Sequence, residues 1–223
     1  MQNLASPSPM PVPERRWRDL VSRGEVPLLL VRHGQTAYNQ QRRFVGRTDI
    51  PLDEDGLHQA RRLGERLTGL PRAALYSSPL LRARQTAAAL GSPVVVTGLE
   101  ELDQGELEGL HGQEAFQRYP AFFERWAADP ADVRVPGGET LRECQARSLA
   151  ALADLAHRHE PQLPVVVVAH QMVLASVVLH AVGLPLRFLR LVKQGNTALN
   201  LLGWHPARGL RVYRLNDTGH LDN

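Results

Sequence analysis

The chain has 223 residues, 43% of them hydrophobic, which suits a single α/β domain with one large core. Its 26 basic and 23 acidic residues leave a formal net charge of +3, and the basic residues are scattered along the chain. Nucleic-acid binding is therefore not expected, because polyanion-binding proteins gather positive charge into runs or patches. Apolar runs such as residues 28–31 and 165–169 are far shorter than the roughly 20 residues that a membrane span requires.

The N-terminal sequence, MQNLASPSPMPVPERR, lacks the basic start and apolar stretch of a secretory signal, and we expect a soluble, cytoplasmic protein. Residues 1–13 are rich in proline and serine and are expected to form a disordered tail, because they can bury too little apolar surface to offset their ordering entropy. The domain is expected to span residues 14–223. The only cysteine, Cys144, lies in an apolar helical pattern, which favours packing over a disulfide or a CxxC site.

Apolar runs of strand length then alternate with longer segments of helical period, as in a mostly parallel sheet with crossover helices. In chain order, strands are expected at residues 27–32, 73–77, 94–97, 165–169, 198–204 and 210–215. Helices are expected at residues 57–67, 79–90, 114–128, 140–159 and 171–182. The last two strands are separated by a loop with Pro206 and Gly209 and are expected to pair antiparallel at one edge.

Two of the nine histidines, His33 and His170, directly follow a buried apolar run, in LLLVRH and VVVVAH. In open parallel sheets, ligands bind beyond the carboxyl ends of the strands, so these two histidines are the candidates for chemistry. The other seven fall on expected helices, in loops or near the C-terminus. They are expected to be surface residues or hydrogen-bonded polar residues.

Further candidates recur in order after the expected strands. Arg32-His33-Gly34 is followed by QTAYN, which ends in Asn39, and by RRFVGRTDIPLDEDG. SSPLLRARQTA contains Arg82, LEELDQGELEGL contains Glu101, and PGGET precedes VVVVAHQMV. Each motif alone has an ordinary explanation, such as a structural ion pair for Arg32 or a turn for His33. Their shared position just after strands favours a common site.

With these motifs in this order, residues 28–221 resemble the histidine phosphatase superfamily, also called the phosphoglycerate mutase-like family. The resemblance implies a single-domain, three-layer α/β/α sandwich with a mostly parallel sheet, an antiparallel edge strand and a small helical cap at about residues 111–136. It implies a phosphohistidine intermediate and catalytic roles for Arg32, His33, Arg82, Glu101 and His170. Phosphate or substrate binding is implied for Arg32, Asn39, Gly46, Arg82, His170 and Gln171.

The residue types suit this chemistry. A phosphoryl group carries nearly two negative charges, and guanidinium groups such as those of Arg32 and Arg82 fit its oxygens bidentately. The His33 imidazole must be unprotonated on its attacking nitrogen, and we expect a backbone carbonyl to hold the other nitrogen. A protonated His170 and the Asn39 amide are expected to donate to the equatorial oxygens.

Departure of an alkoxide requires a general acid, and the same carboxylate can afterwards activate water. Glu100, Glu101, Asp103, Glu106 and Glu108 all lie close enough in sequence to serve. The family pattern, a carboxylate four residues before Gly105, implies Glu101. Neither a metal nor another cofactor is expected, because the sequence contains no HExxH motif, no CxxC motif, no clustered aspartates and no P-loop.

The phosphatase branch is favoured over cofactor-dependent phosphoglycerate mutases. Mutases of the family usually carry a basic insertion after the glutamate motif. Here the corresponding segment, residues 110–135, is short and contains only three arginines. Val45 replaces a hydroxyl residue that mutases tend to have. Gln171 and Met172 follow His170 where the family commonly has glycine, so the Gln171 side chain is expected to narrow the phosphate pocket or to contact substrate.

The expected partner is a small phosphate ester. Candidates implied by the family are phosphoglycerates and their glycosyl derivatives, sugar phosphates, nucleotide monophosphates and a phosphorylated ribazole. A weakly active protein that binds a phosphorylated ligand or acts as a scaffold is a second alternative. The sequence leaves the oligomeric state open, with a homodimer among the options.

Overall fold

The computed structural model describes residues 14–222, so the predicted tail at residues 1–13 lies outside the described residues. The strands are β1 (Val26–Arg32), β2 (Ala74–Ser77), β3 (Val94–Val95), β4 (Val165–Ala169), β5 (Leu199–His205) and β6 (Gly209–Asp217). They form one sheet in the order β3-β2-β4-β1-β5-β6. β1 to β4 are parallel, and β5 pairs antiparallel with both β1 and β6. The predicted mostly parallel sheet with an antiparallel pair at one edge is confirmed.

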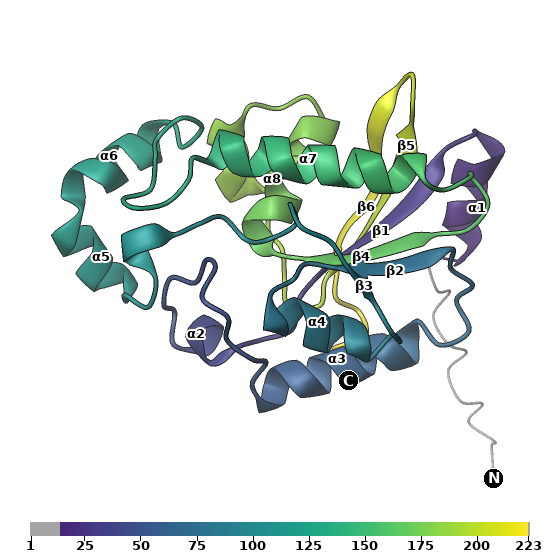
Figure 1. Cartoon of the computed structure of the whole chain (residues 1–223), viewed down its shortest axis with the longest axis horizontal. Helices are drawn as coiled ribbons and strands as arrows, with labels where there is room; N and C mark the ends of the chain where they lie inside the picture. The colour runs from purple at the N-terminus through teal and green to yellow at the C-terminus, as the bar shows by residue number, and fades with distance from the viewer. Residues whose placement is uncertain (1–13, 223) are drawn as a thin grey trace, which may run out of the picture.

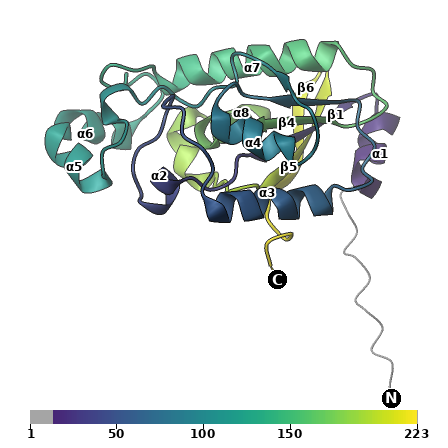
Figure 2. The same cartoon turned by 60° about the horizontal axis from the view of Figure 1, so that its bottom comes forward.

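Helices cover both faces of this sheet (Figures 1 and 2). The α-helices are α1 (Glu14–Ser22), α2 (Ala37–Gln40), α3 (Glu54–Arg66), α4 (Leu81–Ala88), α5 (Gly112–Arg118), α6 (Pro120–Ala128), α7 (Leu141–His157) and α8 (Gln171–Ala181). Two 3-10 helices are η1 (Gly105–Leu107) and η2 (Leu186–Leu191). One face packs against α1, α3 and α4, and the other against α7 and α8. The predicted three-layer α/β/α sandwich is therefore confirmed.

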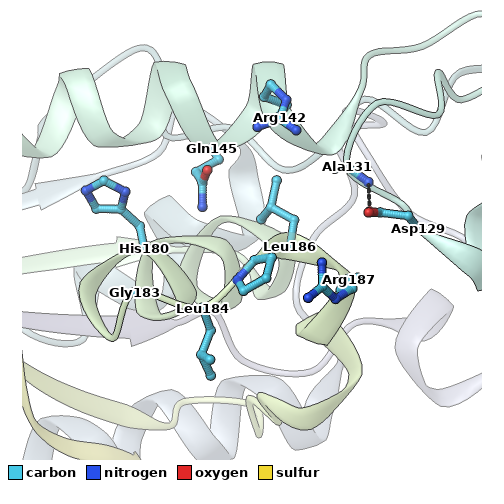
Figure 3. A pocket seen from close by; sticks show the side chains of 10 residues that line it. Asp129, Ala131, Arg142, Gln145, His180, Gly183, Leu184, Leu186 and Arg187 are labelled. Atoms are coloured by element: carbon cyan, nitrogen blue, oxygen red, sulfur yellow. Dashed lines mark hydrogen bonds between the residues drawn. The ribbon is translucent and has the colours of Figure 1, made fainter.

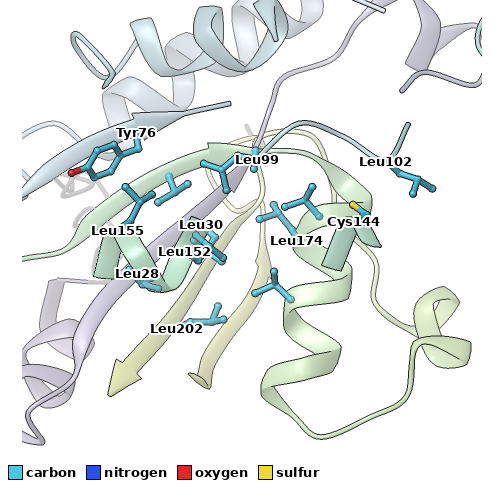
Figure 4. Packing of buried hydrophobic residues seen from close by; sticks show 14 of the residues in the cluster. Leu28, Leu30, Tyr76, Leu99, Leu102, Cys144, Leu152, Leu155, Leu174 and Leu202 are labelled. Carbon is cyan, nitrogen blue, oxygen red and sulfur yellow. The ribbon is translucent and has the colours of Figure 1, made fainter. Parts of the chain in front are cut away.

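Alternating side chains of the central strands pack into two separate cores, one on each face of the sheet. Leu28 and Leu30 of β1 point toward α7 and α8. There they pack in one cluster with Leu152 and Leu155 of α7 and Leu174 of α8 (Figure 4). Their neighbours Leu29 and Val31 point to the opposite face, against α1, α3 and α4. All seven residues of β1 are buried, as expected for a strand with both faces covered by helices. This burial fixes the position of the carboxyl ends of the central strands.

Local capping signals explain where two helices begin. Asp53 is the N-cap of α3 and accepts a hydrogen bond from the Gly56 amide. Thr140 and Glu143 form a capping box at the start of α7. Cys144 of α7 is fully buried in the larger core, and burial raises the pKa of its thiol, consistent with the predicted packing role.

Three elements differ from the sequence-based expectation. The helix predicted over residues 114–128 is two helices, because Tyr119 leaves the helical conformation and Pro120 starts a new helix as its first residue. The third strand is only Val94–Val95, and both side chains are exposed at the sheet edge. Helices α1 and α2 were not predicted; α1 packs Trp17 and Leu20 into the smaller core.

Residues 111–136, expected from the resemblance to form a cap, contain α5 and α6, which protrude at one end of the molecule (Figure 1). Aromatic side chains pack within this segment and connect it to Phe44. Phe116 and Phe122 pack on Phe123, whose ring lies 5.9 Å from that of Phe44. Within residues 14–222, no helix is both long and apolar enough to cross a membrane.

Candidate active site

Strand pairing brings the two candidate histidines together. Arg32 is the last residue of β1 and pairs with Ala169, the last residue of β4, so His33 and His170 leave the sheet side by side. The amide of His33 donates to the Ala169 carbonyl at 3.0 Å. The two imidazole rings lie 5.1 Å apart, centroid to centroid, and are 2% and 0% exposed. The sheet thus positions both rings through their backbones.

The His33 ring has a defined tautomer. Its Nδ1 lies 2.6 Å from the Gly34 carbonyl, which can only accept a hydrogen bond, so Nδ1 carries the proton and Nε2 keeps its lone pair. Burial, followed by the nearby Arg82 and Arg32 cations, holds the pKa of His33 well below its usual range. The imidazole is therefore neutral at pH 7 and available as a nucleophile.

His170 differs from the prediction of a protonated donor. Burial, and then the Arg82 charge, hold the pKa of His170 well below its usual range, so the ring is neutral. Its Nε2 lies 2.7 Å from the Ser78 hydroxyl, which already accepts from the Leu80 amide at 3.3 Å. Our hypothesis is that the Ser78 hydroxyl donates to Nε2, so that the His170 proton lies on Nδ1, the ring nitrogen that has no partner within residues 14–222. A neutral His170 still offers one N–H donor.

Arg32 and Arg82 supply two cations beside these rings. Nη1 of Arg32 donates to the Gln194 carbonyl at 2.6 Å. Arg82 is fully buried, and its two Nη atoms donate to the carbonyls of Thr48 at 3.0 Å and Gly46 at 2.7 Å. Burial lowers the pKa of Arg32 to about 10, which leaves it charged at neutral pH. Backbone carbonyls therefore orient both guanidinium groups without neutralising them.

Three of these side chains keep a polar atom without a partner. In the described part of the chain, four buried side-chain atoms form no hydrogen bond: Trp17 Nε1, Arg32 Nε, Arg82 Nε and His170 Nδ1. An orphaned buried donor costs about 1–3 kcal/mol unless a ligand satisfies it. Arg32, Arg82 and His170 interact electrostatically with one another and with His33. With the His170 proton on Nδ1, the three unsatisfied atoms are donors, and they equal in number the three non-bridging oxygens of a phosphoryl group.

Glu101 is the only buried carboxylate among the five candidates, at 5% exposure. It accepts from the amides of Leu102 at 2.8 Å and Met172 at 3.1 Å. Burial nevertheless raises the pKa of Glu101, because it outweighs these hydrogen bonds and the nearby arginines. A raised pKa moves the titration of this carboxyl group toward neutral pH, which favours a role in acid–base catalysis.

The four competing carboxylates are occupied elsewhere. Glu100 accepts from the Gly98 amide, Asp103 from the Gly105 amide, and Glu106 from the Tyr119 hydroxyl. Glu108 accepts from the amides of Arg47 and Thr48 at 2.6 and 2.7 Å. Glu108 thereby holds the loop whose carbonyls orient Arg82, a structural role that the sequence did not indicate.

The remaining predicted residues surround this centre at different depths. Asn39 and Gln171 line a cavity of about 380 Å³ together with Arg32. The Asn39 Oδ1 is used locally, since it accepts from Thr36 in the capping box of α2. Gly46 is buried and does not line that cavity; an added Cβ there would lie 2.4 Å from Glu108 and 2.6 Å from the Gln104 amide. The Gly46 position thus has no room for a side chain.

Sequence reasoning missed several supporting residues. Asn196 Nδ2 and the Thr197 amide donate to the His33 carbonyl at 3.2 and 3.3 Å. Arg147 donates to the Glu101 carbonyl at 3.0 Å. Ser78, which contacts His170, had a sequence signal, because it lies in the SSPLLRARQTA motif with Arg82. The others join segments far apart in the chain and carry no local pattern.

A larger cavity of about 500 Å³ lies between α7, the end of α8 and the segment leading into η2 (Figure 3). Arg142, Gln145, His180 and Arg187 contribute to its lining. None of the predicted catalytic residues does, and Arg142 is paired with Asp132. We therefore place the chemistry at the smaller cavity next to Arg32. Among the described residues, no group of three or more His, Cys, Asp or Glu side chains could hold a metal ion.

The sequence profile of the histidine phosphatase superfamily (branch 1) matches residues 28–218. The chain belongs to this superfamily. It is 33% identical over 202 residues to a probable phosphoglycerate mutase, GpmB, of Enterobacter sp. (strain 638), covering 86% of this chain and 94% of that protein. The predicted family and fold are thus confirmed.

Two solved structures are similar in fold to this chain. Bacillus stearothermophilus YhfR matches with a TM-score of 0.82 and 30% identity, over 88% of this chain and 99% of that one. A mycobacterial glucosyl-3-phosphoglycerate phosphatase matches with a TM-score of 0.77 and 31% identity, over 86% of this chain and 98% of that one. Relatives named as a mutase and as a phosphatase are therefore similarly distant from this chain.

Proposed function

We propose that this histidine phosphatase superfamily member hydrolyses small-molecule phosphate monoesters through a phosphohistidine on His33. The observation that carries the proposal is the set of three unsatisfied buried donors, on Arg32, Arg82 and His170, beside a neutral imidazole. In our proposal, these donors bind the phosphoryl oxygens and stabilise the transition state without reorganisation.

In the first step, Nε2 of His33 attacks phosphorus in line with the ester oxygen. The N–P bond forms as the P–O bond to the alcohol breaks, and protonated Glu101 gives its proton to the departing oxygen. Arg32, Arg82 and Nδ1–H of His170 bind the three equatorial oxygens. The free alcohol leaves, and Glu101 is left as a carboxylate.

In the second step, the Glu101 carboxylate takes a proton from water as the water oxygen attacks phosphorus. The N–P bond breaks, inorganic phosphate leaves, and Nε2 of His33 regains its lone pair. Glu101 is protonated again, ready for the next turnover. The raised pKa of Glu101 suits both halves of the cycle, because a group that titrates nearer neutrality is an effective acid and an effective base.

Phosphoglycerate mutase activity is the second candidate, favoured by the 33% identity to a probable phosphoglycerate mutase. A mutase would transfer the phosphoryl group from His33 back to a phosphoglycerate instead of to water. Phosphatase activity is favoured over mutase activity by the short segment of residues 110–135 and by Val45. In our proposal, residues 111–136 form a cap that selects the alcohol part of the substrate.

The test is to trap the intermediate. Brief mixing with a radiolabelled phosphate ester, followed by alkaline quench, is expected to leave acid-labile label on wild-type protein and none on His33→Ala. Release of free phosphate, measured with and without a chelator, should be equal if the arginines supply the positive charge. Loss of activity with the chelator, label on His33→Ala, or isomerisation of phosphoglycerate faster than phosphate release would contradict the proposal.

A further inference from the structure

The cavity next to Arg32 is lined by polar and positively charged side chains. The polar and charged residues of its lining are Arg32, Asn39, Arg42, Arg43, Gln171 and Asn196. None of the lining residues carries a carboxylate, so the cavity has a positive potential that nothing in its own wall neutralises. Its volume of about 380 Å³ lies in the range of small-ligand sites. It has room for the alcohol part of an ester whose phosphate is bound by Arg32.

The three arginines of this cavity are held differently. Arg32 is tied to the Gln194 carbonyl, and its free Nε belongs to the phosphate site. Arg43 is tied down by two bonds, from Nη1 to the Gly109 carbonyl at 2.6 Å and from Nε to Gln41 at 2.8 Å. Within residues 14–222, the Arg42 guanidinium forms no hydrogen bond or ion pair and is exposed. Arg42 is therefore the cation that can turn toward a ligand.

The backbone of Arg42 gives a second, independent indication. Arg42 follows the C-cap of α2 with a φ of 54°, in the left-handed region, and its amide donates to the Asn39 carbonyl at 3.2 Å. Glycine or asparagine usually occupies this position at the end of a helix, because a longer side chain is strained there. Strained residues persist where the side chain serves a purpose, and this strain lies at the wall of the candidate site.

We infer that Arg42 binds a second negatively charged group on the alcohol part of the substrate, a carboxylate or a second phosphate. Guanidinium pairs with either group through two parallel hydrogen bonds. The inference rests on the proposed phosphatase function, since it assumes that the ester phosphate lies at Arg32. Its consequence is that this enzyme prefers phosphate esters of acidic alcohols to esters of neutral alcohols of the same size.

The experiment compares kcat/KM within two matched pairs of esters. One pair is 3-phosphoglycerate and glycerol 3-phosphate, which differ by a carboxylate. The other is a propanediol bisphosphate and the corresponding monophosphate. Wild-type enzyme is expected to prefer the more anionic member of at least one pair. Arg42→Asn should reduce that preference by about 10-fold, as expected for loss of a charge-assisted hydrogen bond at a partly exposed site. The pair that responds identifies the anion.

Two further variants separate charge from strain. Arg42→Lys keeps the charge in the same backbone conformation and should retain most of the preference. Arg42→Gly removes both charge and strain, so it should lose the preference without any fall in Tm. Arg190→Ala removes another exposed arginine, on η2, and serves as the control for a general loss of positive charge.

The outcomes distinguish this inference from the function on which it rests. If the enzyme hydrolyses the neutral esters but has no preference in either pair, the inference about Arg42 is overturned and the proposed function stands. A preference that survives in Arg42→Asn, or falls equally in Arg190→Ala, also overturns the inference alone. Enzyme that hydrolyses none of the four esters overturns the proposed function together with the inference.

Discussion

The centre around His33 and the loop around Arg42 are built on opposite principles. His33 and His170 are buried, follow two adjacent central strands, and have their rings tied to a carbonyl and a hydroxyl. Arg42 lies on an exposed loop with a strained backbone and a free guanidinium. In our proposals, the core of the fold positions the residues for phosphate chemistry, whereas loop side chains such as Arg42 select the rest of the substrate. Such loops can change without disturbing the core.

Glu101→Gln is expected to have the largest effect on kcat. That effect would confirm that the buried centre carries the chemistry. Without an acid, expulsion of an alkoxide slows, and we expect kcat for an alkyl phosphate to fall by roughly 10²–10⁴-fold. With p-nitrophenyl phosphate, whose leaving group needs no proton, the first step should slow far less. Steady-state and pre-steady-state assays on both esters test this. Glu106→Gln is the control, and an equal loss in both variants would remove Glu101 from the mechanism.

The same variant should change the pH profile of kcat/KM. The attacking His33 must be neutral, and its pKa is lowered, so activity should decline only well below pH 6.5. Glu101 must be protonated for the first step, and its pKa is raised, so the alkaline limb should begin above the usual range of a glutamate. In Glu101→Gln the alkaline limb should disappear while the acid limb stays. An alkaline limb that persists would assign it to another group.

Arg82→Ala is the next largest expected effect. It removes one unsatisfied donor of the phosphate site and leaves the Gly46 and Thr48 carbonyls without their partner. We expect a loss in kcat of roughly 10²–10³-fold, as for removal of one transition-state donor. Arg84→Ala, an exposed arginine on the same helix, is the matched control and should retain activity. The stability of each variant is checked by urea unfolding.

Ser78→Ala tests whether the His170 proton is held on Nδ1. Removing the hydroxyl frees Nε2, so the neutral ring can populate both tautomers, and we expect roughly a 10-fold loss of kcat. Nitrogen-15 NMR of the His170 imidazole should show one tautomer in the wild type and a mixture in Ser78→Ala. Ser78→Thr keeps a hydroxyl and should recover most of the activity. An unchanged spectrum in Ser78→Ala would contradict this role.

The smallest effect concerns His220 and stability rather than turnover. His220 is 6% exposed, bonds to the Thr197 hydroxyl at 2.9 Å, and has its pKa lowered to about 4 by burial and by Arg66. The unfolded chain therefore binds more protons between pH 6.5 and 4. The contribution of His220 to the free energy of unfolding is therefore fully present above pH 6.5. It falls by about 3 kcal/mol in total as the pH is lowered toward 4.

Urea unfolding of the wild type and His220→Gln at pH 7 and pH 5 measures this contribution. The difference in unfolding free energy between the two proteins should shrink as the pH falls, because only the wild type loses the His220 contribution. His58→Gln, an exposed histidine, is the control and should show no such trend. A constant difference across pH would mean that His220 does not titrate in this range.

The fold could be read from the sequence because its signals are local. Alternation of apolar strands with amphipathic helices, and the caps at Asp53 and Thr140, depend on residues a few positions apart. The break at Pro120 was a local signal that the sequence-based prediction of one helix overlooked. Helix α1 carries few apolar residues, and it packs Trp17, Leu20 and the partly buried Val21 against the smaller core, so its stability comes from tertiary packing.

For the site, the sequence by itself determined the family, the order of the motifs and the residue types that phosphate chemistry requires. Tertiary structure decided which carboxylate is buried, that the pKa of His170 is lowered, how Glu108 supports the centre, and that the Arg42 guanidinium has no partner within residues 14–222. The physical reason is that burial, tautomer and pKa depend on contacts between segments far apart in the chain. No spacing or periodicity in the sequence encodes those contacts.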